Sequence, residues 1–145
     1  MIYLDTSVLV TALTLEAETA RVQAWLADRA DGELCISDWV VSEFSSALAL
    51  KLRRGELIAD ERARVLSNWR IVQQENVVIV PVPAPAFDLA ARFCDRHELG
   101  LRAGDALHLA VASLGGHRLA TLDVAMARAA VAVGVPVEAV GGALG

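Results

Sequence analysis

The sequence contains few of the residues on which several common classes of site depend. It has two cysteines, Cys35 and Cys94, and neither belongs to a C-x-x-C pair, so a zinc ribbon and a thiol redox motif are excluded. We expect both to be buried, reduced thiols. The phosphate-binding pattern G-x-x-x-x-G-K is missing, and Lys51 is the only lysine. These absences exclude a P-loop nucleotide-binding site and a receiver domain, which needs a lysine late in the chain.

No run of apolar residues is long enough to span a membrane, although 55% of the chain is apolar and the mean hydropathy is +0.46. A membrane helix needs roughly 18 such residues without interruption. The longest candidate, residues 77–87, has 11 residues and contains three prolines. The chain also has Asp5 and no basic residue before Arg21, unlike a secretory signal. We therefore expect a cytoplasmic protein without membrane contact.

Positive charge is scarce as well. Thirteen lysines and arginines against eighteen aspartates and glutamates give a net charge of −5, which by itself argues against tight binding to nucleic acid. The objection weakens if several acids gather at one site and are neutralised by metal, because the remaining surface is then closer to balance. All the basic residues except Lys51 are arginines, which suit bidentate phosphate contacts.

The pattern of apolar residues predicts strands that alternate with helices. Residues 77–82 are apolar and mostly β-branched, so we expect a strand buried on both faces. The order predicts one α/β domain, residues 1–140, in which helices cover both faces of a parallel sheet, and then a flexible tail, residues 141–145. The expected strands are 1–4, 34–36, 77–82, 118–122 and 135–140, and the expected helices are 8–13, 18–30, 39–54, 60–74, 87–96, 105–114 and 124–133.

Four acids stand where such a sheet places its functional residues, outside the carboxyl ends of the strands. Asp5 ends the first expected strand and Asp123 ends the fourth. Asp105 opens a helix, and Glu43 lies one to two turns into the helix after the second strand. Each has apolar neighbours. Carboxylates that converge need protons, arginines or divalent cations, and hard oxygen ligands select Mg²⁺ or Mn²⁺.

Each aspartate taken alone also has a simple structural explanation. Asp5 and Asp123 could cap the helices that follow them, and Asp105 could favour its helix dipole. Glu43 has no capping role in the middle of an apolar helix. His108 lies three residues after Asp105 on the same helix face, and we expect it to have a packing or orienting role.

Four further polar residues are candidate auxiliary groups. Thr6, Ser7 and Thr121 could hydrogen-bond water or phosphate at the site, and they could equally be local caps. Arg102, close to the third acid, is the arginine best placed to contact phosphate. A surface ion pair between Arg102 and Glu98 is the alternative.

These residues resemble the acidic motifs of PIN-domain ribonucleases of the VapC type, the toxins of VapBC toxin-antitoxin pairs. The resemblance rests, in order and spacing, on Asp-Thr-Ser at 5–7, Ser-Glu at 42–43, Asp-Ala-Leu-His-Leu-Ala at 105–110 and Thr-Leu-Asp at 121–123. It spans nearly the whole chain. It implies a single PIN-like domain built on a five-stranded parallel sheet with helices on both faces.

The resemblance also implies an activity and its partners. It implies an endoribonuclease that depends on one or two Mg²⁺ or Mn²⁺ ions, forms a homodimer and is inhibited by a VapB-like antitoxin. Asp5, Asp105 and Asp123 would bind metal, and Glu43 would do so directly or through water. Family members often carry a further acid or asparagine where this chain has residues 125–127, Ala-Met-Ala, so the second ion is in question. Because no side-chain nucleophile and base pair is visible, a metal-activated water is the expected nucleophile.

One alternative from a different class stays open. A PIN fold with weak or no activity could bind only RNA or a protein partner. The missing downstream acid favours this alternative, while the four retained acids disfavour it. The abundance of alanine, valine and leucine could reflect an apolar surface for a dimer or an antitoxin. An aspartyl phosphatase is excluded, because it needs D-x-D in the first motif and position 7 is serine.

Overall fold

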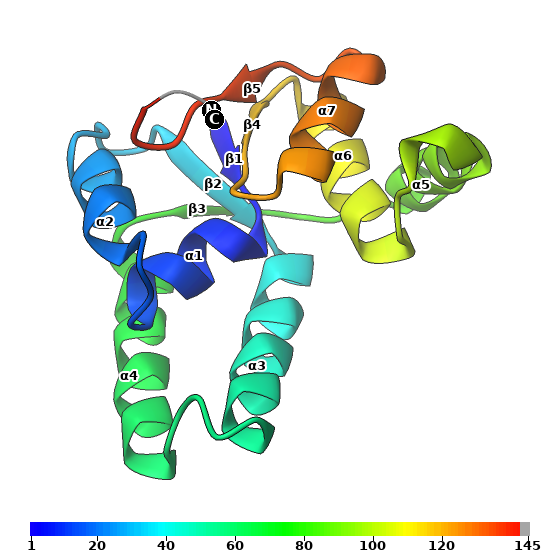
Figure 1. Ribbon diagram of the computed structural model, residues 1–145. Helices are drawn as coiled ribbons and strands as arrows, with labels where there is room; N and C mark the ends of the chain where they lie inside the picture. The colour runs from blue at the N-terminus through cyan, green and yellow to red at the C-terminus, as the bar shows by residue number, and fades with distance from the viewer. Residues whose placement is uncertain (143–145) are drawn as a thin grey trace.

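The structure of the protein, a computed structural model, describes residues 1–142 and shows strands that alternate with helices (Figure 1). The strands are β1 (Ile2–Leu4), β2 (Leu34–Ser37), β3 (Val78–Val80), β4 (Arg118–Ala120) and β5 (Val137–Glu138). The helices are α1 (Thr6–Leu13), α2 (Thr19–Ala27), α3 (Asp38–Arg53), α4 (Ala59–Glu75), α5 (Ala84–Asp95), α6 (Ala103–Gly115) and α7 (Val124–Ala132), with a short 3-10 helix, η1 (His97–Leu99). Within these residues no helix is long and apolar enough to cross a membrane. The expected tail, 141–145, lies mostly outside the described residues.

The five strands form one parallel sheet in the order β3-β2-β1-β4-β5, which confirms the predicted α/β fold. β1 is the central strand, and its three residues are fully buried. Ile2 pairs with Leu34 on one side and with Arg118 on the other. The first strand of the sequence is therefore the core of the sheet.

The order of the strands places a topological switch between β1 and β4. The chain runs outward from β1 through β2 to β3, then crosses back to β4 and β5. With right-handed crossovers, α1 to α4 cover one face of the sheet and α5 to α7 cover the other, as Figure 1 shows. The connections after β1 and β4 consequently leave on opposite faces, and a crevice opens between them at the carboxyl ends of the strands.

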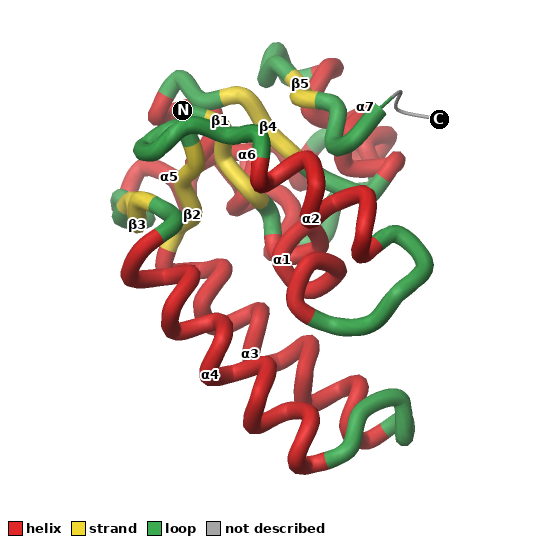
Figure 2. The backbone as a smooth tube through the Cα atoms, turned by 90° about the vertical axis from the view of Figure 1, so that its left-hand side faces the viewer, coloured by secondary structure: helices red, strands yellow, loops and turns green. Residues whose placement is uncertain are grey.

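Helices α3 and α4 form an antiparallel pair that extends away from the sheet (Figure 2). Phe44 of α3 stacks on Trp69 of α4, with ring centroids 4.5 Å apart and an angle of 27° between the rings. Both side chains are buried. This contact holds the sheet-proximal part of α3, the part that carries Glu43, against the body of the protein.

The expectation that residues 77–82 form a strand buried on both faces is wrong. β3 is a strand of three residues at the edge of the sheet, and Val78 and Ile79 are each 42% exposed. A β-branched run indicates a strand, but its burial depends on how many neighbours the topology supplies. Pro81 and Pro83 after this strand suit an edge position, because proline has no backbone N–H to donate to a further strand.

The two cysteines differ in burial. Cys35 in β2 is buried, as expected, whereas Cys94 near the end of α5 is only partly buried, which corrects the expectation for that residue. Cys94 lies on the wall of an apolar hollow between α5 and α6 that remains open to solvent. Both thiols are free.

Candidate active site

The crevice at the switch point contains a hollow of about 650 Å³. Glu43, Asp105 and Asp123 line it together with Arg102, and so come from three separate parts of the chain. Its remaining wall consists of Trp39, Leu99, Gly100, Leu101, Gly104, Ala125 and Met126. Three of the four predicted acids therefore share one solvent-filled space.

Asp5, the fourth acid, lies behind this hollow and is 4% exposed. It follows the central strand directly. Ser7 Oγ donates to its Oδ1 at 2.5 Å, and Thr121 Oγ1 donates to its Oδ2 at 2.5 Å. Burial raises the pKa of Asp5 above its ordinary value, and the hydrogen bonds from Ser7 and Thr121 only partly offset that rise. Asp5 is thus a buried carboxylate held by hydroxyl groups without a cationic partner within ion-pair distance among the described residues.

Glu43 projects from α3 toward α6. Its Oε1 accepts hydrogen bonds from Thr6 Oγ1 at 2.6 Å and from His108 Nε2. Burial acts to raise the pKa of Glu43, but the hydrogen bonds from His108 and Thr6 help to outweigh it, so the pKa falls below the ordinary value. Glu43 therefore remains ionised despite its partly buried position.

Asp105 and Asp123 complete the acidic group. Burial first, and then the nearby charge of Asp123, raise the pKa of Asp105. Glu43 acts on it in the same direction. Asp123 also caps α7, accepting from the backbone N–H of Met126 at 3.1 Å. The capping explanation and the site explanation consequently both hold for this residue.

The predicted auxiliary residues lie at the same place. Thr6 contacts Glu43, and Ser7 both donates to Asp5 and accepts from the backbone N–H of Leu122 at 3.1 Å. Thr121 accepts from the backbone N–H of Asp123 at 3.0 Å. These three hydroxyl groups tie the loops after β1 and β4 to the acids.

Arg102 is exposed on the rim of the hollow. The alternative ion pair with Glu98 is wrong, because Glu98 instead pairs with Arg96 at 3.0 Å. Arg96 is closer to Glu98 in sequence and directly precedes the short helix η1, which contains Glu98. Within residues 1–142, Arg102 forms no ion pair, so its guanidinium is available to an anion at the mouth of the hollow.

The donor set of the hollow fits a hard divalent cation. The acids supply only carboxylate oxygens, and the charges of Asp123 and Glu43 add to burial in raising the pKa of Asp105, which His108 offsets only in part. As described over residues 1–142, no three His, Cys, Asp or Glu side chains already converge on a single point where they could hold a metal ion. Binding would therefore require some of these carboxylates to move closer together than they lie in the metal-free protein.

Several site residues could not be named from the sequence. Tyr3 Oη lies 2.7 Å from Ser37 Oγ and 2.8 Å from His108 Nδ1, so a buried row of polar side chains leads to Glu43. The sequence offered one signal for Tyr3 and Ser37: each places a hydroxyl group in an otherwise apolar strand. Gly104 also belongs to the wall, because a Cβ there would lie 3.1 Å from Glu43 Oε2.

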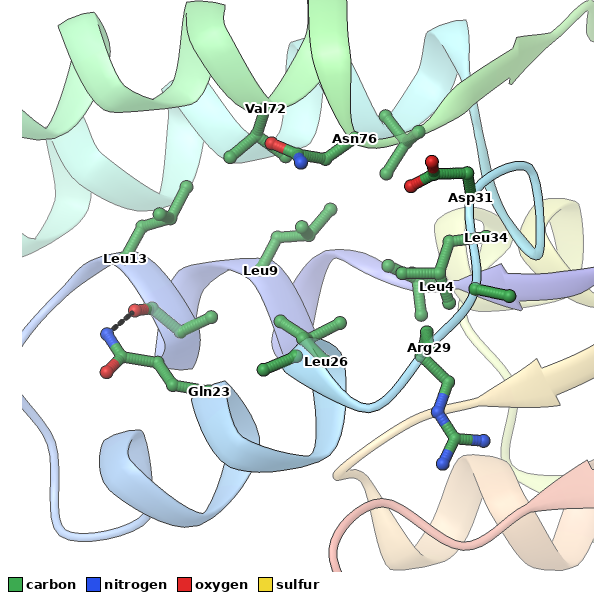
Figure 3. A pocket seen from close by; sticks show the side chains of 14 residues that line it. Leu4, Leu9, Leu13, Gln23, Leu26, Arg29, Asp31, Leu34, Val72 and Asn76 are labelled. Carbon is green, nitrogen blue, oxygen red and sulfur yellow. Dashed lines mark hydrogen bonds between the residues drawn. The ribbon is translucent and has the colours of Figure 1, made fainter.

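A second hollow, of about 270 Å³, lies between α1, α2 and α4 (Figure 3). Its wall is rich in leucines, and Gln23 Nε2 donates to the backbone carbonyl of Ala12 at 2.8 Å. Arg29 at its edge already pairs with Glu33 and Glu138. None of the predicted site residues lines this hollow. The candidate active site is therefore the acidic hollow at the switch point.

Solved structures with a similar fold come from toxin-antitoxin systems. A FitAB complex bound to an IR36 DNA fragment is 22% identical, with a TM-score of 0.74, over 100% of this chain and 99% of that one. VapC20 of Mycobacterium tuberculosis, a toxin that cleaves the sarcin-ricin loop, is 20% identical, with a TM-score of 0.71, over 89% and 95%. VapBC2 of Rickettsia felis, bound to promoter DNA, is 15% identical, with a TM-score of 0.65, over 96% and 98%. At these identities the likeness shows the fold.

The family model for the PIN domain matches residues 2–132, which include all four acids. No curated protein matches the sequence significantly. The family match covers most of the chain, and it agrees with the strand order and with the acids at the switch point. The chain therefore belongs to the PIN domain family.

Proposed function

We propose that this protein is a Mg²⁺- or Mn²⁺-dependent endoribonuclease and the toxin of a type II toxin-antitoxin system. The observation that carries the proposal is the hollow at the switch point of a PIN fold, which Glu43, Asp105 and Asp123 line and to which Asp5 is linked through the hydroxyl of Thr121. The family membership supports nuclease activity, and the similar toxins, including one that cleaves the sarcin-ricin loop, support RNA as the substrate.

The acids and Arg102 have separate roles in the proposed hydrolysis of a phosphodiester. Asp5, Asp105 and Asp123 would hold the cation, with Glu43 binding it directly or through water. A bound divalent ion supplies a Lewis acid that polarises the phosphate and lowers the pKa of water. Arg102 on the rim would bind a phosphate oxygen of the incoming strand.

Water is the proposed nucleophile. The wall of the hollow contains no serine, threonine, cysteine or lysine side chain among the described residues. Ala125 and Met126 occupy the segment after Asp123 and line the same wall without offering a carboxylate. We therefore propose that a single ion is held tightly.

The proposed partners are a VapB-like antitoxin and a second copy of the chain. One of the solved structures with a similar fold is a toxin-antitoxin complex. Large apolar side chains are exposed on the chain, including Phe87 at 58% and Leu114 at 49%. Burying such side chains in a dimer or under an antitoxin would remove apolar surface from water.

A module without activity that binds RNA or protein is the second candidate. It is favoured by one observation: the segment after Asp123 contributes Ala125 and Met126 to the wall and no further carboxylate. The two candidates differ in whether the acids are needed for RNA cleavage or only for folding.

The deciding experiment incubates the purified protein, freed of partners, with a mixed RNA pool in Mg²⁺, in Mn²⁺ or in EDTA. Wild type is compared with Asp5→Asn and with Asp60→Asn, an exposed acid outside the hollow, as the matched control. Cleavage that needs metal and Asp5 but not Asp60 supports the nuclease. Cleavage that persists in EDTA contradicts the metal-dependent mechanism. RNA binding without cleavage by the folded wild type favours the second candidate.

A further inference from the structure

A row of four hydrogen-bonded side chains crosses the middle of the protein and ends at Glu43. Ser37 Oγ lies 2.7 Å from Tyr3 Oη, and Tyr3 Oη lies 2.8 Å from His108 Nδ1. His108 Nε2 then contacts Glu43 Oε1. The four residues come from β2, β1, α6 and α3. Tyr3 and Ser37 are fully buried and His108 is 2% exposed, so water does not compete for these bonds.

The hydrogen-bonding capacity of each group gives this row a direction. An ionised carboxylate only accepts, so His108 Nε2 must carry the proton that it shares with Glu43. In a neutral imidazole the other nitrogen, Nδ1, is then an acceptor, and it needs the hydroxyl proton of Tyr3. Tyr3 has a single proton to give, so Ser37 must donate to Tyr3. With His108 neutral, the donors therefore run from Ser37 through Tyr3 and His108 to Glu43.

The contacts of Glu43 decide which of its two oxygens remains free. Oε1 accepts from His108 and also from Thr6 Oγ1 at 2.6 Å, so its acceptor positions are filled from the protein side. Oε2 lies beside Gly104, where a Cβ would be only 3.1 Å away. Because position 104 has no side chain, Oε2 keeps open access to the acidic hollow, which both residues line.

We propose that Tyr3 and His108 are positioning residues, which turn Glu43 so that Oε1 is bound by the protein and Oε2 is presented to a divalent cation in the hollow. This proposal rests on the proposed function. It assigns a role to a buried polar row that the mechanism itself does not use. The cation would then bind an oxygen that is already oriented, because residues that hydrogen-bond to a metal ligand generally fix its orientation.

A purely structural role for the row predicts something different. Apolar side chains of similar shape would pack the same space, and replacing a buried polar network in this way is often neutral for stability. If the row only filled space, loss of the Tyr3 hydroxyl would leave cation binding unchanged in a protein that still folds. If the row positions Glu43, cation binding weakens while the fold persists.

The first part of the test reads the row directly and does not require a metal. Nitrogen NMR of the three histidine side chains in the wild-type protein in EDTA reports which ring nitrogen of His108 carries the proton. We expect Nε2–H with Nδ1 as acceptor, and a changed Nδ1 signal in Tyr3→Phe. Nδ1–H in the wild type, or no change in Tyr3→Phe, would overturn the assigned direction.

The second part measures the dissociation constant for Mn²⁺ by electron paramagnetic resonance, together with kcat and KM for RNA cleavage. The variants are Tyr3→Phe, His108→Leu and His108→Gln, of which the last keeps an N–H donor for Glu43. Thr14→Val is the control, because it removes a buried hydroxyl that bonds to the carbonyl of Val10 at 2.6 Å, outside the hollow. Thermal unfolding in EDTA shows whether each variant is folded.

We expect Tyr3→Phe and His108→Leu to weaken Mn²⁺ binding by about tenfold or more, His108→Gln to restore part of the affinity, and Thr14→Val to leave it unchanged. Folded variants that bind Mn²⁺ as tightly as the wild type would overturn the positioning role and leave the proposed function intact. A wild type that cleaves no RNA and binds no Mn²⁺ would overturn the proposed function, and with it this role.

Discussion

Thr121 Oγ1 donates to Asp5 Oδ2 at 2.5 Å, across 116 positions of the sequence. The same hydroxyl oxygen accepts the backbone N–H of Asp123 at 3.0 Å. Thr121 is 1% exposed, so no water replaces either bond. One buried hydroxyl group thereby links the acid that follows β1 to the acid that follows β4.

Replacing Thr121 by valine is expected to loosen this link. The variant keeps the shape of the side chain but leaves Asp5 Oδ2 and the N–H of Asp123 without the partner that Thr121 supplies, which costs about 1–3 kcal/mol. Thr121→Ser keeps the hydroxyl and is the matched control. Chemical unfolding in EDTA and a Mn²⁺ titration measure the two effects. Equal stability and equal Mn²⁺ affinity of the valine and serine variants would contradict the linking role.

Asp105→Asn is expected to stabilise the metal-free protein while it abolishes activity. Burial and the charge of Asp123 raise the pKa of Asp105. The ionised form therefore costs stability, and the cost grows as the pH rises from the ordinary value of 3.8 through the raised pKa. The gain in stability, of order 1 kcal/mol, should be largest at neutral pH and should close as the pH falls toward 3.8. Thermal unfolding in EDTA across this range would show it.

If Asp105→Asn destabilises the protein, or stabilises it equally at every pH, the acids do not repel one another in the folded protein. Asp60→Asn serves as the reference, because Asp60 is exposed and lies outside the hollow.

Mn²⁺ is expected to raise the melting temperature of the wild type but not of Asp5→Asn. A ligand that binds only the folded state stabilises it by about 2.7 kcal/mol at a concentration 100 times its Kd. For a domain of this size that is on the order of 5 to 10 °C. Calorimetric scans with and without Mn²⁺ measure the shift. A similar rise in both proteins would place the bound ion somewhere other than the acidic hollow.

Gly104→Ala is expected to lower activity without unfolding the protein. The added Cβ would lie 3.1 Å from Glu43 Oε2 and 3.4 Å from Trp39 Cζ2, so both side chains must shift by a few tenths of an ångström. Alanine is otherwise favoured in a helix by up to about 1 kcal/mol. We expect kcat/KM to fall about tenfold or more with an unchanged melting temperature. Ser113→Ala, exposed on the same helix, is the control, and full activity of Gly104→Ala would show that free space beside Glu43 is not needed.

The two thiols are expected to react at different rates with an alkylating reagent. Burial raises the pKa of Cys35 to about 11, so its thiolate is scarce at neutral pH, whereas Cys94 is partly exposed. Because the pKa of Cys35 is higher in the folded chain, its contribution to stability is complete below the ordinary value of 9.0 and is lost as the pH rises toward 11. Mass spectrometry after a short exposure at pH 7.5 should find the label on Cys94 alone, and early labelling of Cys35 would contradict its burial.

The sequence was sufficient to predict the fold, and to predict which acids follow strands, because both leave local signals. Strands and helices alternate with clear apolar periods, and Asp5 and Asp123 come directly after strands. The place of each strand within the sheet, at its centre or at its edge, leaves no such local signal. The burial of residues 78–80 depends on a strand order that only long-range pairing decides, so an apolar run was placed in the interior although it forms an edge.

The contacts of the acids were harder to predict than their identity. His108 was correctly placed on the face of α6 that carries Asp105, but its partners Tyr3 and Glu43 lie on other elements, 105 and 65 positions away. Arg102 and Glu98 are four residues apart, yet the turn at Gly100, with φ of 64°, separates them. Spacing along a chain predicts contacts within one helix, whereas this site is built between elements.

The central place of β1 has a consequence for the newborn chain. Ile2 to Leu4 are synthesised before residues 118–120, which form one of their two neighbours in the sheet. The hydrogen bond from Thr121 to Asp5 likewise cannot form until residue 121 has been synthesised. Such distant pairings close long loops, which slows folding. A prematurely terminated product would carry Asp5 and Glu43 without Asp105 and Asp123, so the strand order makes the acidic hollow a property of the completed sheet and not of any shorter piece of the chain.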